Sequence, residues 1–244
     1  DLRKEIKRHF QLYDPYSIYV RALLAWGDWV QGRQALPRST IVPLLDPHQE
    51  DGFRQALNII DREGGVMICD GVGLGKSYIA LAIIEHALRQ GESVLLLAPR
   101  AILDASWDYY LRDYLRRYSL GFDVLKALPI TWFGFKPEPT EVERNRAEGK
   151  GEPLPAVKAA DRDKYEELDA WAEQAQVVVI DESHNYRRTD ANRYVNLLRM
   201  LQPKLLGKKK VVLLTATPLN TDYQDVTAQF RLITLESGAV GGLP

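Results

Sequence analysis

The sequence is poor in cysteine and has no long hydrophobic run. Only one of its 244 residues, Cys69, is a cysteine, which excludes an internal disulfide framework and any zinc site built from paired cysteines. No apolar stretch reaches the ~18 residues that a membrane-spanning helix needs, and no signal-peptide pattern opens the chain. We therefore expect a cytoplasmic protein without a membrane partner.

An excess of charge of either sign is also missing. The 32 Lys and Arg residues nearly balance the 33 Asp and Glu residues, giving a formal net charge of -1. Any nucleic-acid surface must therefore be a local basic patch and not a field of the whole protein. The chain begins with Asp1 and not with Met, so we expect it to be a piece of a longer protein.

Short apolar runs alternate with helical patterns from about residue 49 onward. The runs lie at residues 66–69, 94–98, 177–180 and 211–214. Continuously apolar strands that alternate with helices predict an α/β fold with a mostly parallel sheet, buried on both faces.

Two segments depart from this alternation. Residues 1–38 carry apolar side chains at helical spacing and predict an N-terminal helical accessory segment, followed by the α/β domain at residues 39–244. Residues 126–161 hold five prolines among many charges, which predicts a mobile insertion within that domain. A small subdomain is the alternative interpretation of that segment.

A glycine-rich loop follows the first apolar run and opens a helix. It contains three glycines, Gly71, Gly73 and Gly75. Such glycines let the backbone amides turn toward phosphate oxygens beside a helix N-terminus. Lys76 is then predicted to reach the β- and γ-phosphates of ATP, and the Ser77 hydroxyl to bind Mg²⁺. The first position is Asp70 where the usual pattern has glycine, and a plain strand-to-helix turn is the alternative.

The run at residues 177–180 leads directly into an acidic box, Asp181-Glu182-Ser183-His184. Strand ends line the crevice of an open α/β sheet, so this pair of carboxylates stands where a magnesium site needs it. Asp181 is expected to hold the Mg²⁺ hydration shell, and Glu182 to orient and deprotonate the attacking water. The place of His184 favours a role near the γ-phosphate. Alone, the two acids would be a helix cap.

The last apolar run ends in Thr215-Ala216-Thr217-Pro218. Thr215 and Thr217 are expected to hydrogen-bond the acidic box and so to transmit the state of the phosphate. A polar strand end stopped by proline is the alternative.

In this order the motifs resemble those of superfamily 2 helicases and translocases, especially the Swi/Snf-type branch, over about residues 40–235. The resemblance implies a RecA-like P-loop NTPase fold, a three-layer α/β/α sandwich. It also implies that Pro99 and Arg100 of motif Ia contact a nucleic-acid backbone, and that Gln49 hydrogen-bonds the adenine edge. Ser183 stands where alanine is usual, a small-for-small change expected to have no effect.

The second RecA-like domain of such motors, with its arginine finger, does not fit in the residues after Pro218. An arginine finger raises turnover by about 10³- to 10⁵-fold. The chain alone is therefore expected to bind Mg-ATP, to hydrolyse it slowly, and to need that second domain as a partner. Accessory protein subunits are a further class of partner to consider.

The nucleic-acid partner depends mainly on the resemblance. Residues 107–118 interleave basic and aromatic side chains, but the pattern favours an amphipathic helix with a solvated basic face over a nucleic-acid surface. Arg187 and Arg188 suit either a phosphate contact or the plain surface. No residue distinguishes DNA from RNA by its chemistry, so double-stranded DNA is favoured by the Swi/Snf-like motifs alone.

Two functions follow from these patterns. The first is the ATP-binding motor domain of an ATP-dependent DNA helicase or translocase. The alternative is a nucleotide-gated protein-interaction module without motor activity. A P-loop GTPase is disfavoured because the sequence lacks an Asn-Lys-x-Asp run for guanine.

Overall fold

The computed structural model describes residues 36–71, 73–115, 124–136, 149, 159–202, 209–218 and 223–235. From Pro37 onward these residues belong to one compact unit. The predicted helices of residues 1–35, nearly all of residues 137–158 and the basic residues at 116–117 lie outside the described part. Among the described residues, no helix is both long enough and apolar enough to cross a membrane.

The centre of the fold is a sheet of five parallel strands in the order β1-β5-β4-β2-β3. The strands are β1 (Gly65–Ile68), β2 (Val94–Ala98), β3 (Leu125–Pro129), β4 (Val177–Ile180) and β5 (Lys210–Leu214). Four of them coincide with the apolar runs of the sequence. The prediction of an α/β fold with a mostly parallel sheet is thus confirmed.

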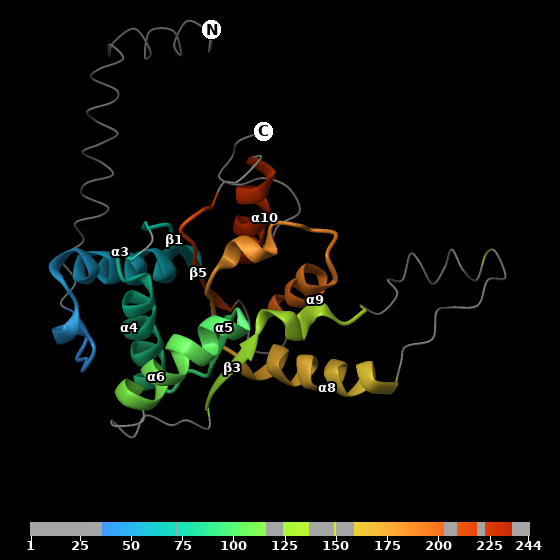
Figure 1. Ribbon diagram of the computed structural model, residues 1–244, viewed down its shortest axis with the longest axis horizontal. Helices are drawn as coiled ribbons and strands as arrows, with labels where there is room; N and C mark the ends of the chain where they lie inside the picture. The colour runs from blue at the N-terminus through green and yellow to red at the C-terminus, as the bar shows by residue number, and fades with distance from the viewer. Residues whose placement is uncertain are drawn as a thin grey trace, which may run out of the picture. The chain divides into compact units, whose positions relative to one another are not determined.

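Helices cover both faces of this sheet (Figure 1). On one side lie α3 (Pro47–Glu63), α4 (Lys76–Arg89) and a helix over residues 100–115 that contains α5 (Arg100–Ile102) and α6 (Asp108–Tyr110). On the other side lie α8 (Ala159–Gln174), α9 (Asn192–Leu201) and α10 (Tyr223–Thr234). Short 3₁₀ turns occur at η1 (Val42–Leu44), η6 (Ile130–Gly134) and η7 (Ser183–Tyr186).

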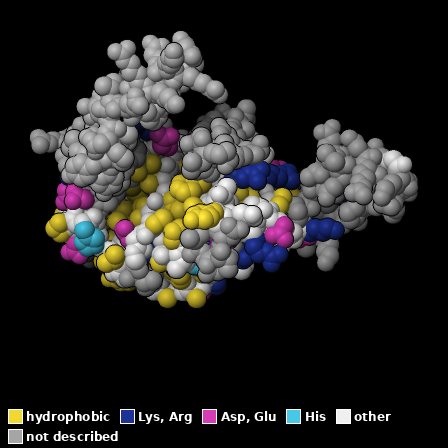
Figure 2. All heavy atoms as spheres, turned by 90° about the horizontal axis from the view of Figure 1, so that it is seen from above, with side chains coloured by type: hydrophobic (Ala, Val, Ile, Leu, Met, Phe, Trp, Pro, Cys, Tyr) yellow, Lys and Arg dark blue, Asp and Glu magenta, His cyan; other side chains and the backbone are white. Residues whose placement is uncertain are grey.

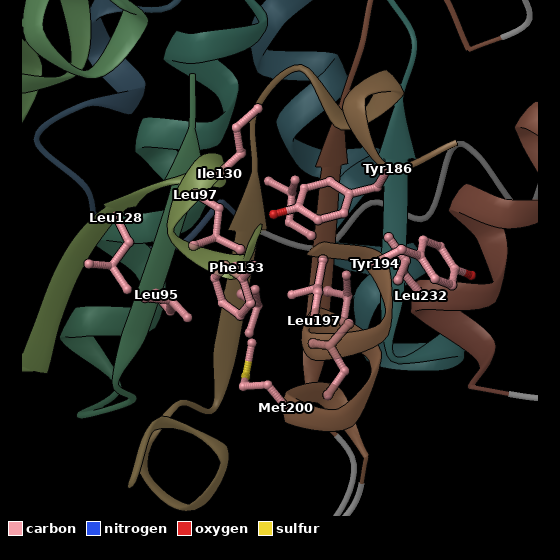
Figure 3. Close-up of a cluster of buried hydrophobic side chains, with 14 of the residues drawn as sticks. Leu95, Leu97, Leu128, Ile130, Phe133, Tyr186, Tyr194, Leu197, Met200 and Leu232 are labelled. Atoms are coloured by element: carbon pink, nitrogen blue, oxygen red, sulfur yellow. The ribbon is translucent and has the colours of Figure 1, made fainter. Parts of the chain in front are cut away.

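The core on the second side joins strands that are far apart in the sequence. Figure 3 shows Leu95 and Leu97 of β2 beside Phe133, with Leu197 and Met200 of α9 facing them. All of these side chains are buried. Because every residue of β4 is buried as well, the sheet has no solvent-exposed face at its centre, as its continuously apolar strands require.

The start of the expected insertion at residues 126–161 is wrong. Residues 125–129 form strand β3, which pairs with β2 from Val94↔Leu125 to Ala98↔Pro129. This edge strand contains Lys126 and is mostly half-buried, so it lacks the apolar run that identified the other four. Its proline is tolerated because an edge strand has one side free of ladder hydrogen bonds.

One buried carboxylate fastens the segment that precedes α3. Glu85 of α4 is fully buried and accepts hydrogen bonds from Thr40 N at 2.9 Å, Ile41 N at 3.1 Å and the Ser39 hydroxyl. Arg89 pairs with it at 2.9 Å. Burial by itself raises the pKa of Glu85, but the hydrogen bonds from Ser39 and Thr40 outweigh burial and hold the pKa below its ordinary value.

Candidate nucleotide and magnesium site

Four strands carry the predicted motifs to one edge of the sheet. Along this edge β1 leads to the glycine-rich loop, β5 to the threonine pair, β4 to the acidic box and β2 to motif Ia. Backbone hydrogen bonds join neighbouring strand ends: Thr215 N donates to Ile68 O at 3.1 Å, and Asp181 N donates to Leu97 O at 2.7 Å. The parallel sheet therefore brings together segments that are far apart in the sequence.

The backbone of the loop depends on two of its glycines. Gly73 and Gly75 have φ angles of 82° and 81°, in the left-handed region that favours glycine. A Cβ atom at Gly75 would also lie 2.1 Å from Gln49 Nε2. This glycine stands at the N-terminus of α4, a helix of 14 residues, whose first amides are a favourable site for a phosphate group.

Lys76 and Ser77 lie where the loop joins α4. Lys76 Nζ donates hydrogen bonds to Asp70 O at 2.6 Å and to Gly71 O at 2.8 Å. The Lys76 ammonium group thus joins two carbonyls at the start of the loop, while its own backbone is the first residue of α4. Ser77 is half-buried in the first turn of α4, next to Lys76.

Gln49 braces the loop from outside. Its Nε2 donates to Leu74 O at 3.2 Å, and its Oε1 accepts from Asp46 N at 3.0 Å as part of the cap of α3. Only 8% of Gln49 is exposed. The structure therefore gives this amide partners within the chain on both of its polar atoms, and an adenine contact would have to exchange one of them.

Asp181 is buried and held at both carboxylate oxygens. Its Oδ2 accepts a hydrogen bond from Trp107 Nε1 at 2.8 Å, and its Oδ1 accepts from Glu182 N at 2.9 Å. Only 6% of Asp181 is exposed. Burial raises the pKa of Asp181, against the lowering effect of these two hydrogen bonds. Nearby positive charge, from Lys76 or from a cation, favours the ionised form.

Glu182 and His184 face each other beside this carboxylate. His184 Nδ1 lies 2.9 Å from Glu182 Oε2, an approach that is not aligned as a hydrogen bond. Glu182 also has a φ angle of 53°, a left-handed conformation that is uncommon outside glycine and typical of functional sites. Two of the predicted site residues are thus in contact, and the turn that carries them is strained.

The acidic box is connected to the threonine pair through α10. Ser183 Oγ donates to Gln229 Oε1 at 2.7 Å, and Gln229 Nε2 donates to Pro218 O at 2.9 Å. Ser183 and Gln229 are both fully buried. From the sequence we expected Thr215 and Thr217 to hydrogen-bond the acidic box, whereas in the structure Thr215 Oγ1 accepts from Thr217 N at 3.1 Å. Ser183 was expected to replace alanine without effect, but its hydroxyl makes a buried hydrogen bond that alanine could not make.

Motif Ia opens the helix over residues 100–115. Pro99 precedes it, and Arg100 forms an exposed ion pair with Asp104 at 2.9 Å, with 71% of the Arg100 side chain exposed. Two π-helical turns, η2 (Leu103–Trp107) and η3 (Leu111–Leu115), lie within this helix; such turns are frequent at functional sites. On the face in Figure 2, the Lys and Arg side chains gather toward the side on which α8 lies in Figure 1, and not on the side of α5 and α6.

Trp107 and Gln229 are the site residues that sequence reasoning missed. Their partners Asp181 and Ser183 are 74 and 46 positions away in the sequence. The periodicity of a helix reports only that a side chain is buried. A serine where the resemblance implies alanine was the one available signal for Gln229, since a buried hydroxyl needs a partner.

Comparison with known proteins shows a family for this chain. A family model described as type III restriction enzyme, res subunit, matches residues 43–220. The chain is 26% identical over 189 residues to the SWI/SNF-related matrix-associated actin-dependent regulator of chromatin subfamily A-like protein 1 of Drosophila melanogaster. It is also 26% identical over 198 residues to the chromodomain-helicase-DNA-binding protein 1-like of Danio rerio. These matches cover 78% of this chain but only 22% and 17% of the two relatives.

A solved structure has a similar fold. It is the Sulfolobus solfataricus SWI2/SNF2 ATPase core in complex with dsDNA, with a TM-score of 0.54 and 16% sequence identity. The similarity covers 82% of this chain and 38% of that chain, and it confirms the predicted RecA-like fold. The chain therefore belongs to the family of the type III restriction enzyme res subunit, it has a RecA-like fold, and its sequence is similar to Swi/Snf-related proteins.

Proposed function

We propose that this chain binds Mg-ATP at the motif-bearing edge of its sheet and forms the first half of an ATP-driven DNA motor. The observation that carries the proposal is that Lys76 and Ser77, after β1, and Asp181 and Glu182, after β4, lie at the same edge of the sheet, where the charge of Lys76 acts on Asp181. Because the chain spans about a fifth of its curated relatives, the activity of the whole motor is proposed for the longer protein.

The residues fit a nucleotide with a bound magnesium ion. The left-handed glycines of the loop and the N-terminus of α4 suit the phosphates, and Lys76 Nζ would exchange its two carbonyl partners for phosphate oxygens. Magnesium prefers one or two protein oxygens together with phosphates and waters, which Ser77 and Asp181 would supply. Bound magnesium would neutralise charge that develops on the phosphates.

Glu182 would orient and deprotonate the attacking water. Its half-buried carboxylate lies just after β4, and its contact with His184 Nδ1 would keep that carboxylate in a fixed orientation. Thr215 and Thr217 would act on the nucleotide indirectly, because the connection from their strand end to the acidic box runs through Gln229. Gln49 would contribute by keeping the loop in place, and would read adenine only after releasing Leu74 O.

Double-stranded DNA is the proposed nucleic acid, and Pro99 and Arg100 are its proposed contacts. The solved relative of similar fold is in complex with dsDNA. Arg100 is exposed and its ion pair with Asp104 lies at the surface, where such pairs contribute roughly 0–1 kcal/mol. The guanidinium can therefore leave Asp104 for a backbone phosphate at little cost.

The experiment measures equilibrium binding of Mg-ATP to the chain and its hydrolysis by the longer protein with and without DNA. We expect Lys76→Ala to weaken binding about 10- to 100-fold, since charged hydrogen bonds contribute about 1.5–3 kcal/mol. Glu182→Gln should retain binding and lose at least about 10²-fold in turnover. Lys126→Ala, on the far edge strand, is the matched control and should change neither.

Unchanged binding in the Lys76→Ala protein would contradict the proposed site. Turnover by the longer protein that ignores added DNA would contradict the motor and favour the nucleotide-gated interaction module. The two halves of the proposal are thus tested separately.

A further inference from the structure

The indole of Trp107 connects the helix after motif Ia to the acidic box. Trp107 is fully buried, and its Nε1 donates to Asp181 Oδ2 at 2.8 Å. An indole has this single donor and no acceptor, so the whole hydrogen-bonding capacity of Trp107 is directed at one carboxylate. A hydrogen bond to an ionised acceptor is roughly twice as strong as a neutral one.

The second oxygen of Asp181 is fixed from another element. Its Oδ1 accepts from the backbone of Glu182, which belongs to the turn after β4. The Asp181 carboxylate is therefore held between two donors. One comes from the turn after β4, and the other comes from the helix that follows the neighbouring strand β2. Two donors on different oxygens leave this buried group a single favourable rotation about its terminal bond.

Trp107 is itself held by aromatic neighbours that reach the phosphate-loop helix. Its ring lies edge-on to Tyr110, with ring centroids 5.8 Å apart and an interplanar angle of 89°. Tyr110 in turn packs on Tyr78 of α4 at 5.2 Å. Tyr78 directly follows Ser77, so this row of three aromatic rings extends from the residue next to Ser77 to the indole that contacts Asp181.

We propose that Trp107 is a positioning residue for magnesium: its indole N–H orients Asp181 so that the carboxylate can hold the metal's hydration shell. The inference rests on the proposed function, in which Asp181 serves magnesium. Partners that orient a metal-binding group typically change metal affinity about 10- to 100-fold when they are removed. Loss of the indole N–H should therefore raise the magnesium requirement without changing how the nucleotide itself is held.

A purely structural Trp107 makes a different prediction. If the ring only fills the core, its replacement lowers stability and leaves the magnesium requirement of the folded protein unchanged. The decisive variant keeps the two-ring shape and replaces the N–H with sulfur, which cannot donate a hydrogen bond; 3-benzothienylalanine incorporated at position 107 does this. Trp107→Phe provides the genetically encoded counterpart.

The experiment measures binding of a fluorescent N-methylanthraniloyl-ADP to the 244-residue chain across a magnesium titration and in EDTA. We expect both position-107 variants to bind the nucleotide in EDTA as the unaltered chain does. Their half-saturating magnesium concentration should rise about 10-fold or more. Trp132→Phe is the matched control, because Trp132 packs among Phe133 and Phe135 on the other side of the sheet, and it should leave the titration unchanged.

A spectroscopic signature tests the contact directly. In a ¹⁵N spectrum of the indoles, the Trp107 resonance is identified by its loss in Trp107→Phe, and we expect Asp181→Asn and added Mg-ADP each to move it. An unaltered magnesium midpoint in the benzothienylalanine protein would overturn the inference. If the unaltered chain binds nucleotide without any response to magnesium or to Lys76→Ala, the proposed function fails instead.

Discussion

Ser183 and Gln229 should behave as a coupled pair in unfolding experiments. The Ser183 hydroxyl and the Gln229 amide are fully buried, and the hydrogen bond between them is 2.7 Å long. Gln229→Leu leaves the hydroxyl without this acceptor, and Ser183→Ala leaves Gln229 Oε1 without its donor. A buried polar group that loses its partner costs about 1–3 kcal/mol, so each single variant should lose about that much stability.

The double variant separates this bond from simple packing. Replacement of both partners by apolar groups removes the unsatisfied atoms together, which is close to neutral for that bond. Gln229 Nε2 also donates to the carbonyls of Pro218 and Asp225, but these bonds are lost equally in Gln229→Leu and in the double variant, so they cancel in the cycle. We therefore expect the double variant to be about 1–2 kcal/mol more stable than the sum of the single losses predicts, within the range seen for contacting residues.

Urea unfolding of the four proteins, followed by circular dichroism, measures the cycle. Thr227→Ala is the control, because Thr227 is exposed on α10 and its hydroxyl bonds only the backbone of its own helix at Tyr223. Combined with Ser183→Ala it should be additive within about 0.5 kcal/mol. The same additivity for Ser183→Ala with Gln229→Leu would refute the coupling and reduce the contact to packing.

Two further predictions concern the surroundings of the site. The hydrogen bonds from residues 39–41 lower the Glu85 pKa, so their stabilisation is fully present above the ordinary value of 4.5 and is lost as the pH falls through the lower folded-state value. Glu85→Gln should thus cost about 1–3 kcal/mol in unfolding free energy at pH 7 and progressively less as the pH falls from 4.5 through the lower folded-state pKa, and a loss that stays constant over that range would contradict this. Gly75→Ala should weaken nucleotide binding more than Gly73→Ala: both positions have a positive φ that costs about 1–2 kcal/mol of backbone strain, but only the Cβ at Gly75 would also displace the Gln49 side chain that holds the loop; equal binding defects in the two would contradict the steric argument.

The central strands were predictable from the sequence because a strand buried on both faces must be apolar throughout. The edge strand β3 was not, since Lys126 and Pro129 are acceptable where one side of a strand is open. Lys76 and Asp181 were predictable for a related reason: each follows a buried strand, and parallel strands deliver their ends to one edge. Their individual roles stay predictions.

The residues that orient the site were not predictable in this way. Trp107 carries an aromatic side chain at helical spacing, a pattern that indicates burial and says nothing about the carboxylate its N–H meets. The contact also depends on the π-helical turn that ends at Trp107, and local sequence gives no simple rule for such turns. Gln229 lies on α10, and its contact with Ser183 depends on the order of the strands in the sheet, which the local sequence around Gln229 does not determine.

The order of the strands also explains why displacements of neighbouring elements would reach the acidic box. β4 lies between β2 and β5, so its end is bonded on one side to the helix after β2, through Trp107, and on the other to α10, through Gln229. The phosphate loop follows β1 at the sheet margin and is connected to the box in two ways: across the β5 end, where Thr215 N bonds Ile68 O, and through the rings of Tyr78, Tyr110 and Trp107. A displacement of the motif Ia helix therefore needs one hydrogen bond to reach the magnesium ligand, whereas a displacement of the loop must pass through the β5 end or through that row of rings.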